Sequence, residues 1–124
     1  DELILMSPWV DVSMDNPDIA AYIGKDPWLT IPWLKTCGRH WAGEYDVHDC
    51  RVSPIYGNVG ELTNTTLFVG TRELFYPDVI KLFDMMEKEG NELVIGSEMN
   101  HVFPLLPIPE AKKYCERIFE TIRR

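Results

Sequence analysis

A glutamate and a histidine follow two apolar segments at matching places. Glu73 comes three residues after Gly70, where the apolar run 66–69 has just ended, and His101 follows the apolar run 93–95. Open α/β sheets gather reactive groups at the carboxyl ends of parallel strands. In an acyl-transfer triad, a histidine takes the proton of the nucleophile and a carboxylate orients its imidazole. Glu73 and His101 are therefore candidates for the acid and the base of such a triad.

The nucleophile of this triad has no candidate in the chain. A Ser-His-acid hydrolase of this kind carries its serine in a Gly-x-Ser-x-Gly turn, and that serine precedes the acid and the histidine. The four serines of the chain all lack these neighbours: Ser7, Ser13, Ser53 and Ser97. The chain also begins with Asp1 rather than with methionine or a signal sequence. We interpret residue 1 as a cut and expect the nucleophile to lie upstream of it.

The apolar pattern predicts alternating strands and helices. Short continuous apolar runs are typical of strands buried on both faces, and apolar residues at helical spacing indicate helices packed on them. The expected strands are Leu3–Met6, 66–69 and 93–95. The expected helices are 18–23 ending at Gly24, 30–42, one from Pro77 to a closing Gly90, and one that opens at Pro109. The last helix has one apolar face, made of Ala111, Tyr114, Cys115, Ile118, Phe119 and Ile122.

The connections predict a single α/β domain over residues 1–124. Crossovers of this length favour parallel strands with helices packed on the faces of the sheet. We expect about three parallel strands, a helical and irregular insertion over residues 13–64, and strand-helix-strand-helix over 65–124. Residues 44–65 form a long irregular connection, and such connections often serve as binding or lid segments.

Four sequence blocks occur in an order and spacing that resembles one family. They are Ser-Pro-Trp-Val-Asp at 7–11, Ser-Pro-Ile at 53–55, Thr-Leu-Phe-Val-Gly-Thr-Arg-Glu at 66–73 and Met-Asn-His-Val-Phe at 99–103. Together they resemble the hormone-sensitive-lipase-like esterases of the α/β-hydrolase superfamily, over their C-terminal half. The resemblance implies the C-terminal part of an α/β-hydrolase fold, a serine carboxylic-ester hydrolase as the parent protein, a small ester substrate and no cofactor.

The resemblance places Glu73 at the acid position of the family and His101 at the position of its base. The family more often has aspartate where this chain has Glu73. Asp78 is the fallback acid, although the first turn of the following helix would also favour a carboxylate there. The His-Gly-Gly oxyanion segment and the Gly-Asp-Ser-Ala-Gly-like elbow of the family are absent. We therefore expect these 124 residues alone to be inactive on esters.

Several residues near the four blocks are candidates for pocket walls: Trp9, Asp11, Phe75, Val102 and Phe103. Trp28, Trp33, Trp41, Tyr56 and Tyr76 are further candidates, because ligand pockets are rich in aromatic side chains. Two alternatives stay open. Any one of the aromatic residues is more often part of the core, and Asp11 could instead accept hydrogen bonds that lock its own loop.

The remaining polar residues do not indicate a metal site. Six residues of metal-ligand type lie close together in sequence but lack zinc-like pairing, so we expect no metal there: His40, Glu44, Asp46, His48, Asp49 and Cys50. Cys37, Cys50 and Cys115 are odd in number and form no Cys-x-x-Cys motif. We expect reduced thiols in a cytoplasmic protein, with Cys115 packed as a small apolar residue.

The charge and hydropathy exclude two classes of partner. A net charge of −8 disfavours nucleic acid, and no apolar run approaches the roughly 20 residues of a membrane span.

The missing nucleophile leaves an alternative to catalysis, in which the chain is a truncated hydrolase remnant that acts as a binding or self-association module. Leu3–Met6 would then offer an unpaired strand edge to a second chain.

Overall fold

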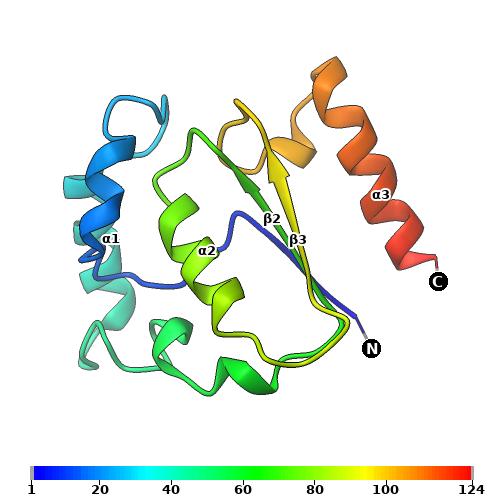
Figure 1. The fold of residues 1–124 in the computed structure, drawn as a ribbon. Coiled ribbons are helices and arrows are strands. Elements are labelled where there is room, and N and C mark those ends of the chain that lie inside the picture. Colours follow the sequence, from blue (N-terminus) through cyan, green and yellow to red (C-terminus); the bar gives the residue numbers. More distant parts are fainter. Residues whose placement is uncertain (1, 124) are drawn as a thin grey trace.

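The computed structural model describes residues 2–123 and contains one parallel sheet. Its strands β1 (Leu3–Met6), β2 (Thr65–Gly70) and β3 (Glu92–Gly96) are hydrogen-bonded in that order (Figure 1). Both neighbouring pairs run parallel. The strands begin or end within one residue of the expected positions, and the parallel arrangement predicted from the crossovers is confirmed.

The central strand β2 is covered on both faces. Leu67 packs in a large apolar cluster with Val79, whereas the next residue, Phe68, packs with Phe103 and Ile118 in a separate cluster. Successive side chains of a strand point to opposite faces of a sheet. The continuous apolar sequence of β2 is therefore explained by burial on both faces.

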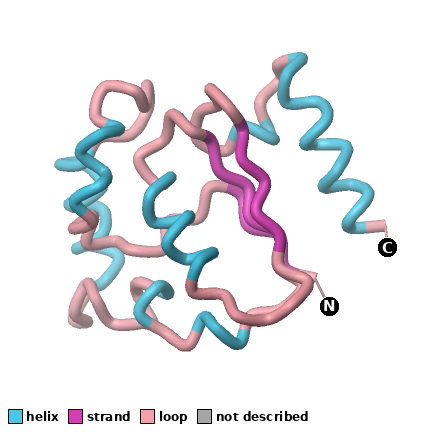
Figure 2. The backbone as a smooth tube through the Cα atoms, in the orientation of Figure 1, coloured by secondary structure: helices cyan, strands magenta, loops and turns pink. Residues whose placement is uncertain are grey.

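Helices cover both faces of the sheet. Helices α1 (Ile31–Ala42) and α2 (Tyr76–Asp84) lie on one side of the sheet, and α3 (Lys112–Ile122) lies on the other (Figures 1 and 2). The expected α1 is observed almost residue for residue, with Pro32 in its first turn. Within residues 2–123, no helix has the length and apolar character needed to cross a bilayer.

Three helical predictions are corrected. Residues Pro17–Tyr22 form a short 3-10 helix rather than an α-helix, between the side-chain cap of Asn16 and Gly24. Helix α2 ends at Asp84, six residues before Gly90, and the Met85 amide closes its last turn by donating to the carbonyls of Lys81 and Leu82. Gly90 instead adopts a φ of 83° in the turn that leads into β3.

The third correction concerns α3, which buries only part of its apolar face. It is preceded by a 3-10 turn over Pro109–Ala111, and Ile118 is buried against the sheet. Phe119 and Ile122 are 52% and 66% exposed. The final turn of α3 therefore leaves more than half of its apolar side-chain surface exposed.

The segment between β1 and β2 is mostly irregular apart from α1. It contains two further 3-10 turns, Pro54–Tyr56 and Val59–Glu61, within the predicted irregular stretch 44–65. The main-chain amide of Ile55 donates to the carbonyl of Val10 at 3.1 Å. This bond fastens the middle of the long connection to the chain that leaves β1.

Candidate active site

Three loops meet at the carboxyl edge of the sheet. Glu73 lies in the turn after β2, His101 in the loop after β3, and Ser7 directly after β1. The β2 and β3 loops are bound to each other, because the Arg72 amide donates to the Met99 carbonyl at 3.1 Å. Gly70 is required at this approach, since a Cβ atom there would collide with the Met99 carbonyl.

Glu73 and His101 contact each other directly. The Nδ1 atom of His101 lies 2.8 Å from Oε2 of Glu73. The glutamate side chain is fully buried, whereas the histidine side chain is 22% exposed. A carboxylate only accepts hydrogen bonds, so this contact places a proton on Nδ1 and leaves Nε2 as the accepting nitrogen of a neutral ring. The ring is thus held in the tautomer that a general base needs.

The second oxygen of the Glu73 carboxylate is held by two other donors. Oε1 accepts from the Gly70 amide at 2.7 Å and from the Ser7 hydroxyl at 2.8 Å. The same Ser7 oxygen accepts from the Val102 amide at 2.8 Å. Sequence reasoning considered Ser7 only as a nucleophile and missed this role. The available signal was its place after β1, at the edge of the sheet that also carries Glu73 and His101.

A row of two aromatic rings, of which Phe75 contacts His101, lies next to the site. The Phe75 ring lies edge-on to the imidazole with centroids 5.2 Å apart, and Trp9 stacks on Phe75 at 5.7 Å. Phe75 is buried and Trp9 is half-buried. Both were candidate pocket residues, and the structure brings them together in one row that ends at His101.

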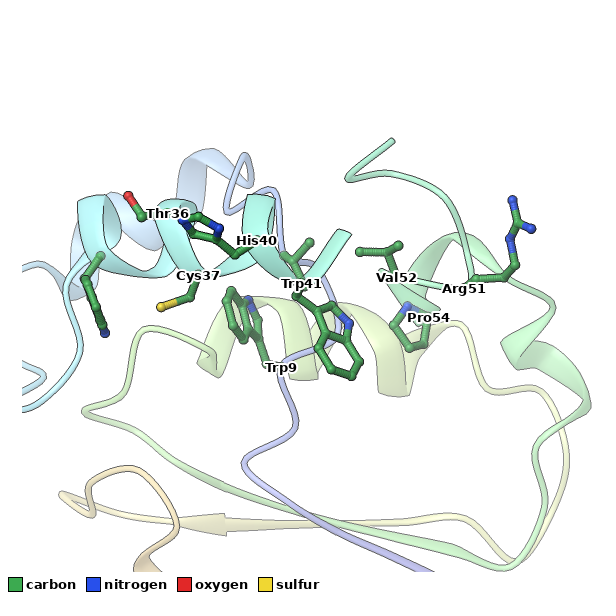
Figure 3. A pocket seen from close by; sticks show the side chains of 10 residues that line it. Trp9, Thr36, Cys37, His40, Trp41, Arg51, Val52 and Pro54 are labelled. Carbon is green, nitrogen blue, oxygen red and sulfur yellow. The ribbon is translucent and has the colours of Figure 1, made fainter. Parts of the chain in front are cut away.

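A hollow of about 790 Å³ opens on the far side of this row, between α1 and the long connection. Trp9 forms part of its wall, together with Cys37, His40 and Trp41 of α1 (Figure 3). Trp41 is 73% exposed. The Arg51 guanidinium points away from the hollow in Figure 3 and lies 4.0 Å from the centroid of the Tyr45 ring. The hollow is thus mainly apolar, with three tryptophans in its wall, and of the size of many ligand pockets.

A comparison with models of protein families identifies the family of this chain. A family model described as "alpha/beta hydrolase fold" matches residues 1–105, which include both Glu73 and His101. The chain belongs to the α/β-hydrolase family. No curated protein gives a significant sequence match to it.

Solved structures agree with this membership. A Staphylococcus aureus protein assigned as an esterase superposes with a TM-score of 0.91 at 31% identity, over 99% of this chain and 43% of its own. An esterase/lipase from an uncultured bacterium gives a TM-score of 0.83 at 26% identity, over 97% and 41%. A hormone-sensitive lipase from a metagenome library shares the fold, with a TM-score of 0.89 at 23% identity, over 98% and 43%. This hydrolase chain therefore spans less than half the length of the structures it matches.

Asp11 of the hydrolase chain lies buried within its own loop. Its carboxylate accepts from the Ser13 amide at 3.0 Å, the Ser13 hydroxyl at 2.6 Å and the Tyr56 hydroxyl at 2.8 Å. Burial, followed by this bond to Asp11, raises the pKa of Tyr56 to about 12. These contacts match the alternative in which Asp11 accepts hydrogen bonds that lock its own loop.

Three other candidates lie in different surroundings. Phe103 is fully buried and meets Tyr114 edge-on at 4.8 Å, so it packs in the core between the sheet and α3. Val102 follows His101 in a left-handed conformation, with φ 49° and ψ 32°. Asp78, the fallback acid, is buried in the first turn of α2 and accepts from the Asn16 amide at 2.8 Å. The histidine at the site is paired with Glu73, not with Asp78.

Three of the residues of metal-ligand type, Asp46, His48 and Asp49, pair with neighbours. His48 contacts Asp46 at 3.0 Å and Asp15 at 3.2 Å, and these two carboxylates raise its pKa. Hydrogen bonds from Arg51 lower the pKa of Asp49 to about 2. Among residues 2–123, no group of three or more His, Cys, Asp or Glu side chains is arranged to hold a metal ion.

Proposed function

We propose that this chain supplies the acid and the histidine of a serine carboxylic-ester hydrolase, with the serine provided by another part of the protein. The observation that supports this most directly is the 2.8 Å contact between Nδ1 of His101 and Oε2 of the fully buried Glu73. Membership of the α/β-hydrolase family and the likeness to esterase structures support the same reaction class.

In the proposed reaction, His101 first accepts a proton and then donates it again. Its Nε2 atom takes the proton of the serine hydroxyl as the serine oxygen attacks the ester carbonyl, and then returns that proton to the departing alcohol. A water molecule, activated in the same way, cleaves the acyl-enzyme and releases the acid. Glu73 keeps its hydrogen bond from Nδ1 throughout, holding the tautomer and stabilising the transient imidazolium.

The row of aromatic rings suggests where the apolar part of the ester binds. The hollow touches Trp9, which stacks on Phe75, which in turn contacts the His101 ring. An apolar substituent of a small ester could lie against Trp9 while its carbonyl stays near the imidazole. We propose this hollow as part of the substrate site of the complete enzyme.

Hydrolysis of p-nitrophenyl acetate by the full-length protein tests the proposal. We expect His101→Ala to remove nearly all activity and Glu73→Gln to lower kcat by roughly 10⁴-fold, because the wrong tautomer of the imidazole is then favoured. His48→Ala and Glu98→Gln are matched controls, since both side chains are exposed and neither contacts Glu73 or His101 in the structure. A wild-type kcat/KM in either site variant would disprove the role assigned to that residue.

The non-catalytic alternative depends on β1. Within residues 2–123, β1 has a neighbouring strand on one side only, which is β2. A free edge of this kind can pair with a second chain, so self-association of these 124 residues remains a prediction. Sedimentation velocity of the chain alone measures it, and a folded monomer at high concentration would argue against the alternative.

A further inference from the structure

The Glu73 carboxylate is fixed by more bonds than its contact with His101 requires. Oε2 faces the histidine, whereas Oε1 receives two donors, the Gly70 amide at 2.7 Å and the Ser7 hydroxyl at 2.8 Å. Because Glu73 is fully buried, each of these bonds replaces a bond to water that the carboxylate has lost. Among the described residues, Ser7 is the one side chain besides the histidine that bonds to this carboxylate.

The Ser7 oxygen also holds the histidine loop. It accepts from the amide of Val102, the residue next to His101, at 2.8 Å. A hydroxyl group has one proton to donate and lone pairs to accept, so both bonds form at once. Ser7 is 66 residues from Glu73 and 95 residues from Val102 in sequence. A single hydroxyl thus joins the ends of all three strands around the acid-histidine pair.

The backbone at both ends of this bond is unusual. Ser7 has a φ of 48° and Val102 a φ of 49°. Left-handed conformations are uncommon for residues other than glycine, and they are rarest for β-branched residues such as valine. Such conformations persist where the surrounding contacts enforce them, and they concentrate at functional sites. The two strained residues are hydrogen-bonded to each other beside the pair.

We propose that Ser7 is a positioning residue of the hydrolase. Its hydroxyl fixes the Glu73 carboxylate and the backbone next to His101 in one arrangement, in which Nδ1 of the imidazole faces Oε2. This proposal rests on the proposed ester hydrolysis for its catalytic consequence. The positioning of the imidazole itself can be measured without any turnover.

Ser53 provides a matched control. It is also fully buried, and its hydroxyl likewise accepts from an amide, that of Val12 at 2.9 Å, and donates to an oxygen, the Val47 carbonyl at 2.6 Å. Neither partner is charged, and neither Glu73 nor His101 is among them. Ser53→Ala therefore reports the general cost of losing a buried serine hydroxyl.

The test compares Ser7→Gly, Ser7→Ala and Ser53→Ala in the full-length protein. Glycine suits the positive φ at position 7, so Ser7→Gly removes the hydroxyl and relaxes the backbone there. With p-nitrophenyl acetate we expect both Ser7 variants to lower kcat by roughly 10- to 100-fold, as for a small misplacement of reacting groups. KM should stay within about twofold of wild type, because Ser7 acts through Glu73 and His101. Ser53→Ala should leave kcat unchanged, and kcat alone is compared for this control because its neighbours Val52 and Pro54 line the hollow.

Two-bond ¹H–¹⁵N spectra of the His101 ring provide the second readout. We expect wild type and Ser53→Ala to show the Nδ1-protonated tautomer at mildly alkaline pH, and Ser7→Gly to show a mixture of the two tautomers. An unchanged tautomer or an unchanged kcat in Ser7→Gly would overturn the proposal, as would equal effects of Ser53→Ala. Failure of both Ser7 variants to fold would also overturn it, because Ser7 would then serve the fold. A wild-type protein inactive on esters would instead refute the proposed function, and the spectra would still decide the role of Ser7.

Discussion

The indole ring of Trp9 stacks on the phenyl ring of Phe75, with an angle of 14° between the ring planes. Trp9 follows β1 and Phe75 follows β2, so the stack joins the loops after two neighbouring strands. On its other side, Phe75 supports the His101 ring. The imidazole is therefore held by an aromatic wall as well as by the Glu73 carboxylate.

Phe75→Ala should weaken the fold and loosen His101. Phe75 is buried, and replacing a buried phenylalanine by alanine lowers the free energy of unfolding by about 3–5 kcal/mol. Urea denaturation of the full-length protein measures this loss. Phe119→Ala is the control, because Phe119 is 52% exposed and its loss should cost about 0.5 kcal/mol or less. Equal losses in the two variants would contradict the supporting role of Phe75.

Glu73→Asp should lower kcat although the charge is kept. The shorter side chain cannot reach the Ser7 hydroxyl, the Gly70 amide and the His101 ring together, because all three bonds are between 2.7 and 2.8 Å in the structure. A displacement of about 1 Å at such a site can cost roughly 100-fold in rate. Steady-state hydrolysis of p-nitrophenyl acetate provides the measurement, with Glu98→Asp as the control. Full activity of Glu73→Asp would show that the loop adapts to either acid.

Asp78→Asn should stabilise the protein at neutral pH. Burial raises the pKa of Asp78, and the Asn16 amide offsets this only in part. Its Oδ2 atom is buried without a hydrogen-bond partner among the described residues. A raised pKa in the folded state means that the contribution of Asp78 to stability is fully present below about pH 3.8, its pKa when unfolded, and is lost as the pH rises through the folded-state value.

The stability difference between Asp78→Asn and wild type should therefore grow as the pH rises from about 3.8 and then level off above the folded-state pKa. Thermal or urea unfolding at several pH values measures it. Asp84→Asn, on the exposed side of the same helix, is the control variant. A constant difference across this range would mean that folding leaves the pKa of Asp78 unchanged, and would contradict the raised value.

The strands were predictable because their burial is visible in the sequence. The run from Thr66 to Val69 is almost continuously apolar, as expected of a strand with both faces covered. The ends of the helices were less predictable. Gly90 is a good helix terminator in isolation, yet α2 ends at Asp84. The loop that follows is bound to a distant segment, because the Thr63 hydroxyl donates to the Glu89 carbonyl at 3.0 Å. Local sequence permits several end points, and the contacts of the following loop select one.

The sequence by itself determined which residue types stand at the ends of β2 and β3, and so it predicted that Glu73 and His101 would meet. Short-range patterns suffice for this, because parallel strands bring their carboxyl ends to one edge. Only the tertiary structure decided that Ser7 bonds to both Glu73 and Val102, and that Phe103 lies in the core rather than in a pocket. These outcomes depend on distances of a few ångströms between residues up to 95 positions apart, and no local pattern encodes them.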